Sequence, residues 1–412
     1  MIHAERQQES AVLAPEDNKS RFWRQLVEAH WEKQSAAFDR VPESLWRLDE
    51  AEVFRLLTWC SEHMNESAVR YYHTRADRTV WELLRPHPEV LPTRADGSLA
   101  AFHERMRGDV PSADGYSIFV NNVVRHDHVT WLGVRDFVRE LVQCAGLPLH
   151  GFNAGIGLGQ YDYTPFGVHV DSGRSAFVQP IVGRKRFRIW PGRYIRQHPE
   201  LIRARGNYSG LEQDSLQLET GAGGLVYWPS DAWHLAEAAN GEFNVMLAIG
   251  AFVGGKRGDA EPGAVPCDID NLQKSAEALP DGFVAAAKGS DLCKRGATAE
   301  HIWVAYLSGL GLQYPVPPRN DALPQARLQI QQTWPILWRR LPDGQFALGV
   351  NGHCVVESGE WIPELIARIN SGVPFAVADL VSQSAGGSTV QKLIERFWAC
   401  RALESATETP QI

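Results

Sequence analysis

The sequence predicts a mainly β fold with helical additions, built around a double-stranded β-helix (jelly-roll) core. Gly221–Pro229 has the composition of a turn followed by a short strand, and Trp233–Ala239 that of a returning strand. Asn240-Gly241 is a favoured two-residue hairpin turn, because both residues tolerate positive φ, and Glu242–Phe252 returns as a buried strand. Successive short antiparallel strands of this kind are typical of a jelly roll.

The chain is long enough for two or three domains. We expect a helical N-terminal region over 1–110, the jelly-roll domain over 111–255, a linker with a helical region over 256–318, and a last domain over 319–412. Asp49 is a candidate N-cap for the second helix. Residues 192–222 form a long excursion inside the barrel, either a lid that contacts substrate or a surface insertion. The predicted helices are 21–33, 49–60, 81–84, 99–106, 134–144, 362–369 and 389–402.

Composition favours a protein without a membrane span and without broad nucleic-acid binding. The net charge of −8 disfavours nucleic acid and mildly favours a cationic or neutral substrate. The six cysteines are scattered, so we expect them to be reduced. The N-terminus is polar and lacks an apolar signal core, which favours a cytoplasmic protein.

One histidine-carboxylate pair has the context of a metal site. The chain contains five H-x-D/E patterns, but His3 lies in a polar tail, His30 in a helix-like run, and His87 and His198 each precede a proline. His169-Val-Asp171 instead lies beside strand-like sequence, where side chains at i and i+2 share a face. His126-Asp-His128 is interpreted as a solvated loop.

His234 supplies a third ligand candidate at the start of a predicted strand. Taken alone it would be interpreted as a buried, hydrogen-bonded histidine of the core. Together with His169 and Asp171 it gives two histidines and one carboxylate, a set that leaves positions open on iron. A structural zinc site is disfavoured, because such sites have four protein ligands, often cysteines.

Alternation in the strand Arg184–Ile189 marks Lys185 as a cation that faces inward. Lys185 shares its face with Phe187 and Ile189, whereas the arginines share the other face. A buried lysine requires an anionic partner, which a carboxylate of a cosubstrate would provide. The alternative is a lysine whose ammonium extends along the surface to solvent. Tyr161, Tyr163 and Asn244 are further pocket candidates that barrel-wall packing would equally explain.

Residues 150–253 resemble the JmjC/cupin-type 2-oxoglutarate oxygenases, and most of all the bacterial ribosomal oxygenases, which hydroxylate proteins. The shared pattern is an H-x-D, a Gln and a Gly, a basic residue two positions later, a G-x-x-x-Y-x-P turn and a distal His. It corresponds here to His169-Val-Asp171, Gln179, Gly183, Lys185, Gly223–Pro229 and His234. Two departures stand out. Pro180 adds one residue before Gly183, so that a β-bulge is expected, and Ser230-Asp231 replaces the usual Pro-Gly.

The resemblance implies an Fe(II)/2-oxoglutarate-dependent dioxygenase with His169, Asp171 and His234 as iron ligands and Lys185 as the cosubstrate anchor. Its substrate would be a residue in a protein or peptide. The alternatives are a free or carrier-bound amino acid, or a non-enzymatic cupin-type binding or regulatory protein. The resemblance also implies a winged-helix-like domain over 319–412 and a homodimer. With nine acidic and eight basic residues from 319 onward, that domain lacks the charge for duplex binding.

Overall fold

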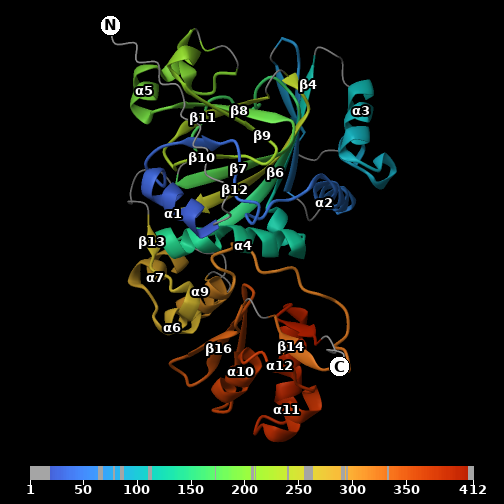
Figure 1. Ribbon diagram of the computed structural model, residues 1–412, viewed down its shortest axis with the longest axis vertical. Coiled ribbons are helices and arrows are strands. Elements are labelled where there is room, and N and C mark those ends of the chain that lie inside the picture. The colour runs from blue at the N-terminus through green and yellow to red at the C-terminus, as the bar shows by residue number, and fades with distance from the viewer. Residues whose placement is uncertain are drawn as a thin grey trace. The chain divides into compact units, whose positions relative to one another are not determined.

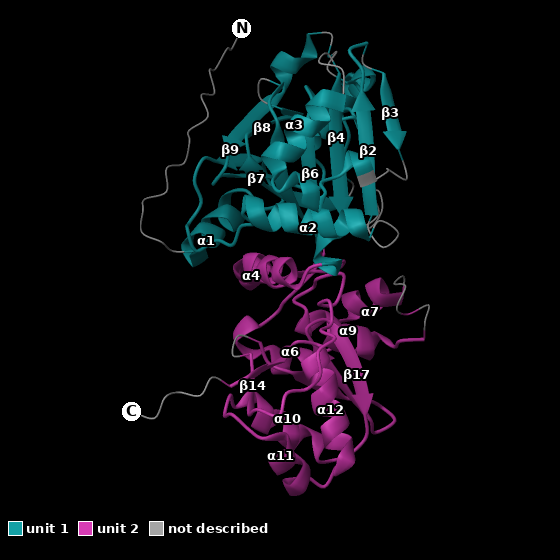
Figure 2. Cartoon of the chain, turned by 90° about the vertical axis from the view of Figure 1, so that its right-hand side faces the viewer, with its two compact units in different colours: residues 1–126, 153–262 teal, residues 127–152, 263–412 magenta. Residues whose placement is uncertain are grey.

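The computed structural model describes residues 19–63, 68–77, 79–83, 88–109, 114–171, 173–205, 208, 210–238, 241–254, 263–288, 293, 296–331 and 334–406 (Figure 1). The predicted N-terminal tail, the hairpin residue Asn240 and most of the predicted linker after Gly254 lie outside these residues. The chain forms two compact units, residues 1–126 with 153–262 and residues 127–152 with 263–412 (Figure 2). The first unit therefore contains the whole segment from His169 to Asn244.

The first unit contains two β-sheets. One has eight strands in the order β1-β10-β7-β12-β6-β4-β2-β3, and the other has three in the order β11-β8-β9. The described part of the unit is thus mainly β, as predicted. The strands are β1 Ala36–Phe38, β2 Ala68–Thr74, β3 Val80–Leu83, β4 Gly115–Asn121, β6 Phe152–Gln160, β7 Arg174–Val182, β8 Arg184–Trp190, β9 Leu216–Gly221, β10 Leu225–Trp228, β11 Trp233–Ala238 and β12 Asn244–Phe252.

The two sheets pack face to face through an apolar core. Its buried members alternate along their strands, so that one face of each strand points at the opposite sheet. The large sheet contributes Ala176, Val178, Val226, Trp228 and Met246, and the small sheet contributes Phe187, Ile189, Leu218 and Ala236. The candidate site residues are carried by these same strands or by the segments that join them.

The expected β-bulge is present in β7. Val245 of β12 pairs with Val182, and the next residue, Met246, pairs with Pro180, so Ile181 has no partner in the ladder. Gly183 then turns the chain at φ +70° into β8, and a Cβ there would lie 2.5 Å from the carbonyl oxygen of Phe243. The bulge absorbs the extra residue before the strand that carries Lys185 begins.

Four α-helices lie in the described part of this unit, α1 Lys19–Ala29, α2 Glu50–Glu62, α3 Leu99–Asp109 and α5 Gly192–Gln197. Asp49 caps α2 as predicted, accepting from the Glu52 amide at 2.7 Å while Glu52 accepts from the Asp49 amide at 2.9 Å. Short 3-10 helices are η1 Pro88–Val90, η2 Arg94–Asp96, η3 Val123–Arg125, η4 Pro199–Leu201 and η5 Leu211–Asp214.

Three local predictions are wrong. The predicted helix at 81–84 is an edge strand, β3, which pairs antiparallel with β2. Its Val and Trp residues suit a strand, and pairing with β2 satisfies its backbone, which outweighs local helix propensity. The solvated loop predicted at His126-Asp-His128 is absent, because Asp127 is buried and caps α4, which spans His128–Ala145. The excursion 192–222 contains α5 and ends in β9. The first helix ends at Ala29, so Glu32 lies beyond it.

The second unit combines helices with small sheets over its own apolar core. Helix α4 His128–Ala145 begins six residues before the predicted start, because Asp127 caps it by accepting from the Thr130 amide at 2.8 Å. Arg135 is buried between the rings of Trp131 and Trp334, 4.8 Å and 4.5 Å from their centroids, and burial lowers its pKa to about 9.

The remaining helices of this unit are α6 Leu272–Glu277, α7 Asp281–Lys288, α9 Ala299–Ser308, α10 Ile362–Asn370, α11 Val377–Gln383 and α12 Ser388–Ala399, with η7 Ile269–Asn271. Its strands are β5 Leu147–Pro148, β13 Ala264–Val265, β14 Leu328–Ile330, β15 Leu337–Arg340, β16 Phe346–Val350, β17 His353–Glu357 and β18 Leu403–Ser405. Turns at 342–344 and 351–352 join β15 to β16 and β16 to β17. None of the described helices combines the length and apolar character required to cross a bilayer.

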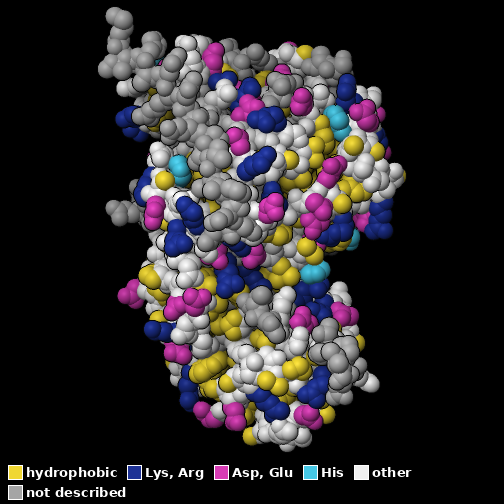
Figure 3. Space-filling view, in the orientation of Figure 1, with side chains coloured by type: hydrophobic (Ala, Val, Ile, Leu, Met, Phe, Trp, Pro, Cys, Tyr) yellow, Lys and Arg dark blue, Asp and Glu magenta, His cyan; other side chains and the backbone are white. Residues whose placement is uncertain are grey.

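Acidic and basic side chains are interspersed over the face of the molecule drawn in Figure 3.

Candidate functional site

Two histidines from distant parts of the sequence face each other across a β-bridge. His169 and His234 form an isolated antiparallel pair. The His169 amide donates to the His234 carbonyl at 3.0 Å, and the His234 amide donates back at 2.8 Å. Their ring centroids are 4.4 Å apart. Direct backbone pairing therefore places the two imidazoles side by side.

Both imidazoles are held with the same nitrogen available. Nδ1 of His169 lies 2.8 Å from the carbonyl oxygen of Gly167, and Nδ1 of His234 lies 3.0 Å from that of Ala232. A carbonyl only accepts, so each Nδ1 carries the proton and each Nε2 keeps its lone pair. This arrangement is the usual support for metal-binding histidines. Burial, with His169 beside it, lowers the pKa of His234 to about 4, which keeps that ring neutral at neutral pH.

Asp171 completes the group. One ligand atom from each of His169, Asp171 and His234 lies within 4.8 Å of the others, and no other group of three His, Cys, Asp or Glu side chains in the described residues meets this criterion. Burial raises the pKa of Asp171, but Arg174 and the two histidines outweigh it and hold that pKa below its ordinary value. Asp171 itself lies in the loop before β7 rather than in a strand. The carboxylate thus lies ionised next to two imidazoles, a donor set that suits a divalent transition metal.

Lys185 faces inward and is fully buried, as the alternation along β8 predicts. Its ammonium donates to the Tyr161 hydroxyl and, over 3.2 Å, to the side-chain oxygen of Asn244. Asn244 is oriented by donating to the Gly159 carbonyl at 3.1 Å. No ion pair of the described residues includes Lys185, and burial lowers its pKa well below the ordinary value although Glu237 opposes this. A buried cation held only by neutral groups fits a site for an anionic ligand.

Tyr161, Asn244 and Lys185 thus come together, whereas Tyr163 lies elsewhere. Tyr163 packs in a second apolar cluster with Val168, Trp190, Ile195, Leu201, Tyr208 and Leu235. Its assignment to the pocket stays a prediction.

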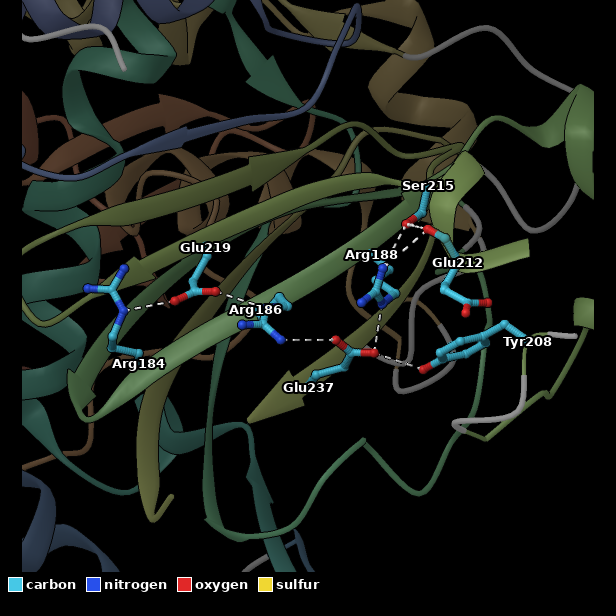
Figure 4. A network of polar contacts seen from close by, with 8 residues as sticks. All are labelled: Arg184, Arg186, Arg188, Tyr208, Glu212, Ser215, Glu219 and Glu237. Atoms are coloured by element: carbon cyan, nitrogen blue, oxygen red, sulfur yellow. Dashed lines mark hydrogen bonds and ion pairs between the residues drawn. The ribbon is translucent and has the colours of Figure 1, made fainter. Parts of the chain in front are cut away.

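The arginines of β8 lie on the opposite face of the strand, where they form an ion-pair ladder (Figure 4). Glu219 bridges Arg184 and Arg186 at 2.9 Å and 2.8 Å. Glu237 binds Arg188 at 2.8 Å and accepts from the Tyr208 hydroxyl at 3.0 Å. The ladder therefore ties the segment after α5 to the strand that carries Lys185.

The segment after α5 also pairs directly with the backbone next to His169. The Val168 amide donates to the Ala204 carbonyl at 3.0 Å, and the Arg203 amide donates to the Val168 carbonyl at 2.9 Å. Gly167 has φ +66°, and a Cβ there would lie 2.4 Å from the Arg203 carbonyl oxygen. The chain around His169 is thus clasped between the excursion on one side and His234 on the other.

Glu32 is a polar residue that links the segment after α1 to β7 and β10, and no sequence pattern predicted it. Glu32 has φ +51° and donates its amide to the Tyr227 hydroxyl at 2.8 Å. Its carboxylate accepts from the hydroxyls of Ser175 and, at 2.6 Å, Ser230. The sequence predicts a helix over 21–33 that would include Glu32, whereas α1 ends at Ala29 and leaves Glu32 free to turn toward these partners.

Two of the other histidine motifs have partners close by in the sequence. His198 lies 3.2 Å from Glu200 in an exposed pair. The carboxylate of Asp127 caps α4 by accepting a hydrogen bond from the Thr130 amide. His3 and His87 lie outside the described residues.

Neither a protein-family model nor a curated protein sequence matches this chain. Among solved structures, the chain is similar to the Escherichia coli protein YcfD at 13% identity and a TM-score of 0.49, covering 93% of this chain and 97% of that one. YcfD described as a ribosomal oxygenase in complex with cobalt and 2-oxoglutarate matches at 14% identity and a TM-score of 0.48 over the same shares. An 11S globulin from Wrightia tinctoria matches at 9% identity and a TM-score of 0.18, over 25% of this chain and 21% of its own.

Proposed function

We propose that this protein is an Fe(II)/2-oxoglutarate-dependent dioxygenase that hydroxylates an amino-acid residue of a protein or peptide. One observation carries the proposal: a site of two histidines and one carboxylate belongs to the same unit as a buried lysine without an anionic partner. The first feature suits iron and leaves coordination positions open. The second suits the distal carboxylate of a dicarboxylic cosubstrate.

The fold supports this assignment. We infer that the two facing sheets form the double-stranded β-helix core, because their antiparallel strands carry all the proposed site residues or flank them. We keep the boundary of this core at 111–255, with a helical, dimer-forming region over 256–318 and a winged-helix-like domain over 319–412. We further propose a cytoplasmic homodimer that binds neither nucleic acid nor membrane.

Each residue has a defined task. His169, Asp171 and His234 would hold Fe(II), and the Gly167 and Ala232 carbonyls keep both Nε2 atoms directed at it. Lys185 would bind the distal carboxylate of 2-oxoglutarate, with Tyr161 and Asn244 orienting its ammonium. When bound, iron and 2-oxoglutarate would supply, together with O₂, the hydroxylation of an unactivated C–H bond: one oxygen atom would enter the substrate and the other succinate, with release of CO₂. The apolar walls of the barrel exclude water from this chemistry.

An anaerobic titration of the Fe(II) protein with 2-oxoglutarate tests the proposal, monitored by the visible charge-transfer band of bidentate chelation. The band is expected in the wild type and absent in His169→Ala. In Lys185→Ala it is expected only at higher cosubstrate concentration. His198→Ala, which removes a half-buried histidine of another H-x-E motif, is the matched control and should behave as wild type.

Iron binding without a charge-transfer band would overturn the cosubstrate assignment and leave a cupin-type binding protein. With the band established, incubation with candidate proteins and a mass measurement for one added oxygen tests the hydroxylase assignment. A free or carrier-bound amino acid that gains the oxygen, while peptides do not, would replace the protein substrate.

A further inference from the structure

An aromatic wall lies next to the proposed iron ligands. Phe166 packs against Tyr72 and Phe119, with ring centroids 5.3 Å and 4.8 Å apart, and its ring centroid is 5.7 Å from that of His169. Phe119 in turn packs against the core between the sheets, so this wall belongs to the inner face of the large sheet. Phe166 and Phe119 are half-buried and therefore partly accessible. A molecule that approached the metal along this wall would contact these rings.

Two arginines of the excursion flank the same wall. Arg203 pairs through its backbone with Val168, and its guanidinium donates to the Phe166 carbonyl at 3.3 Å. Ala204 accepts from the Val168 amide, which places Arg205 one residue further along the same clasp. The Arg203 guanidinium thus contacts the backbone of Phe166, and the charge of Arg205 lies close enough to Tyr72, another ring of this wall, to act on the pKa of its hydroxyl.

The charges of these arginines are not neutralised by the described residues. Arg70, which also lies over the Phe166 ring at 5.6 Å, is paired with Glu82 at 2.6 Å. Arg203 and Arg205 form no ion pair with any carboxylate in the described part of the chain, and Nε of Arg205 is buried without a hydrogen-bond partner there. The neighbouring residues 206, 207 and 209 are Gly, Asn and Ser, so the adjacent sequence provides no carboxylate either.

We infer that Arg203 and Arg205 form an anion-recognition subsite, and that the peptide substrate carries a carboxylate or phosphate beside the residue that is oxidised. An arginine fork matches either group through paired N–H donors. A buried guanidinium nitrogen without a partner is costly, and a bound oxyanion would satisfy it. The inference rests on the proposed function for the position of the reacting residue.

This local charge opposes the charge of the whole chain. The net charge of −8 on its own favours a basic partner. Charges in close contact with the ligand decide its orientation at a site, because exposed charges more than about 8 Å away are screened at physiological salt. The residues next to His169 therefore predict an acidic segment at the site itself.

Fluorescence anisotropy on the full-length protein, loaded anaerobically with Co(II) and 2-oxoglutarate, tests the inference. The probes are short labelled peptides of one Ala-based sequence that carry Glu, phosphoserine or Lys at the same positions. The Glu or phosphoserine peptide is expected to bind more tightly than the Lys peptide. Arg203→Gln/Arg205→Gln should weaken that binding by about tenfold to a hundredfold, as expected for lost charged hydrogen bonds.

The matched control is Arg193→Gln/Arg196→Gln, which removes two exposed arginines from α5 in the same excursion and changes the net charge equally. It should leave peptide affinity within about twofold of wild type, as distant surface charges are screened. Equal losses in both double variants, or no preference for the acidic peptides, would overturn the inference.

Titration of 2-oxoglutarate in the same samples separates the two proposals. Normal cosubstrate binding without acidic-peptide preference removes the anion subsite alone. Absence of cosubstrate binding, with the peptide preference intact, removes the oxygenase assignment and leaves the subsite.

Discussion

The ammonium of Lys185 donates to the side-chain oxygen of Asn244 over 3.2 Å, and no carboxylate of the described residues pairs with this buried cation. Asn244 is itself fixed by the Gly159 carbonyl, so its oxygen is held toward the lysine. The pair thus presents an oriented cation whose charge a neutral amide only partly compensates. Folding tolerates this cost, which an anionic ligand at the proposed site would recover.

Replacing Lys185 with Met is expected to stabilise the ligand-free protein while weakening 2-oxoglutarate binding. Methionine fills similar space without a buried charge, and such replacements are neutral or stabilising by about 1–4 kcal/mol. The Tyr161 hydroxyl lies 3.4 Å from Oδ1 of Asn244, so these two side chains can still form a hydrogen bond with each other. Cosubstrate affinity should fall about tenfold to a hundredfold, as for a lost charged hydrogen bond of about 1.5–3 kcal/mol. Thermal unfolding without ligand and a cosubstrate titration measure both effects, and a destabilised variant with normal affinity would contradict the assignment.

Cosubstrate affinity is also expected to fall as pH rises, well before the ordinary lysine range. Burial lowers the pKa of Lys185 in the ligand-free protein, so its ammonium deprotonates at a lower pH than in the unfolded chain. Only the protonated form pairs with the cosubstrate carboxylate. Between the folded and unfolded pKa values the unfolded chain binds more protons, so the stability of the ligand-free protein rises with pH there. Lys185→Arg, which stays charged, should show a flat affinity profile, and a wild-type profile just as flat would refute this account.

Gly167→Ala is expected to weaken metal binding at least tenfold. A Cβ at Gly167 would meet the Arg203 carbonyl oxygen at 2.4 Å and would also sit at φ +66°. The backbone beside His169 must then shift, at a cost of about 1–3 kcal/mol. Gly210→Ala is the control, because it has a similar φ of +81° with nothing within 4 Å of the added Cβ. Co(II) titration followed by absorbance should separate the two variants, and equal metal affinities would show that the clasp does not hold His169.

Glu237→Gln is expected to lower the free energy of unfolding by about 1–3 kcal/mol, the range for a polar group buried without its full partners. Glu237 is 12% exposed and binds Arg188 and the Tyr208 hydroxyl (Figure 4). Glu360→Gln removes the exposed pair with Arg340, where Glu360 is 73% exposed, and should cost less than about 1 kcal/mol. Denaturant unfolding of both variants compares them directly. A larger loss for Glu360 would mean that the ladder contributes little.

The parts of the site that follow a local rule could be predicted from the sequence. The period of two along β8 identified Lys185 as inward, because strand geometry alone decides which side chains share a face. The position of His234 at the start of β11 followed from the turn signals around it. The β-bulge was predicted from the residue that Pro180 adds before Gly183, and it occurs at Ile181.

The parts of the site that depend on backbone pairing between distant segments could not be predicted from the sequence. The clasp between Val168 and the segment 203–204 consists of amides and carbonyls, which every residue carries and no side-chain pattern reveals. Glu32 reaches its partners only because the chain leaves α1 early in a left-handed conformation. The strand β3 forms where β2 offers it a free edge, a circumstance that the residues of β3 do not encode.

The unpaired Ile181 has a consequence for recognising related chains. Pairing between β7 and β12 resumes on both sides of the bulge. The sequence between Asp171 and Lys185 therefore contains one residue more than the paired strands need. A search pattern with a fixed interval would therefore align Arg184, an outward-facing side chain of the ion-pair ladder, with the proposed cosubstrate anchor. The pairing of β8 with β11, in which Lys185 lies opposite Ala238, identifies the equivalent lysine position whether or not a residue has been inserted in β7. Relatives of this protein are better sought by strand register than by spacing.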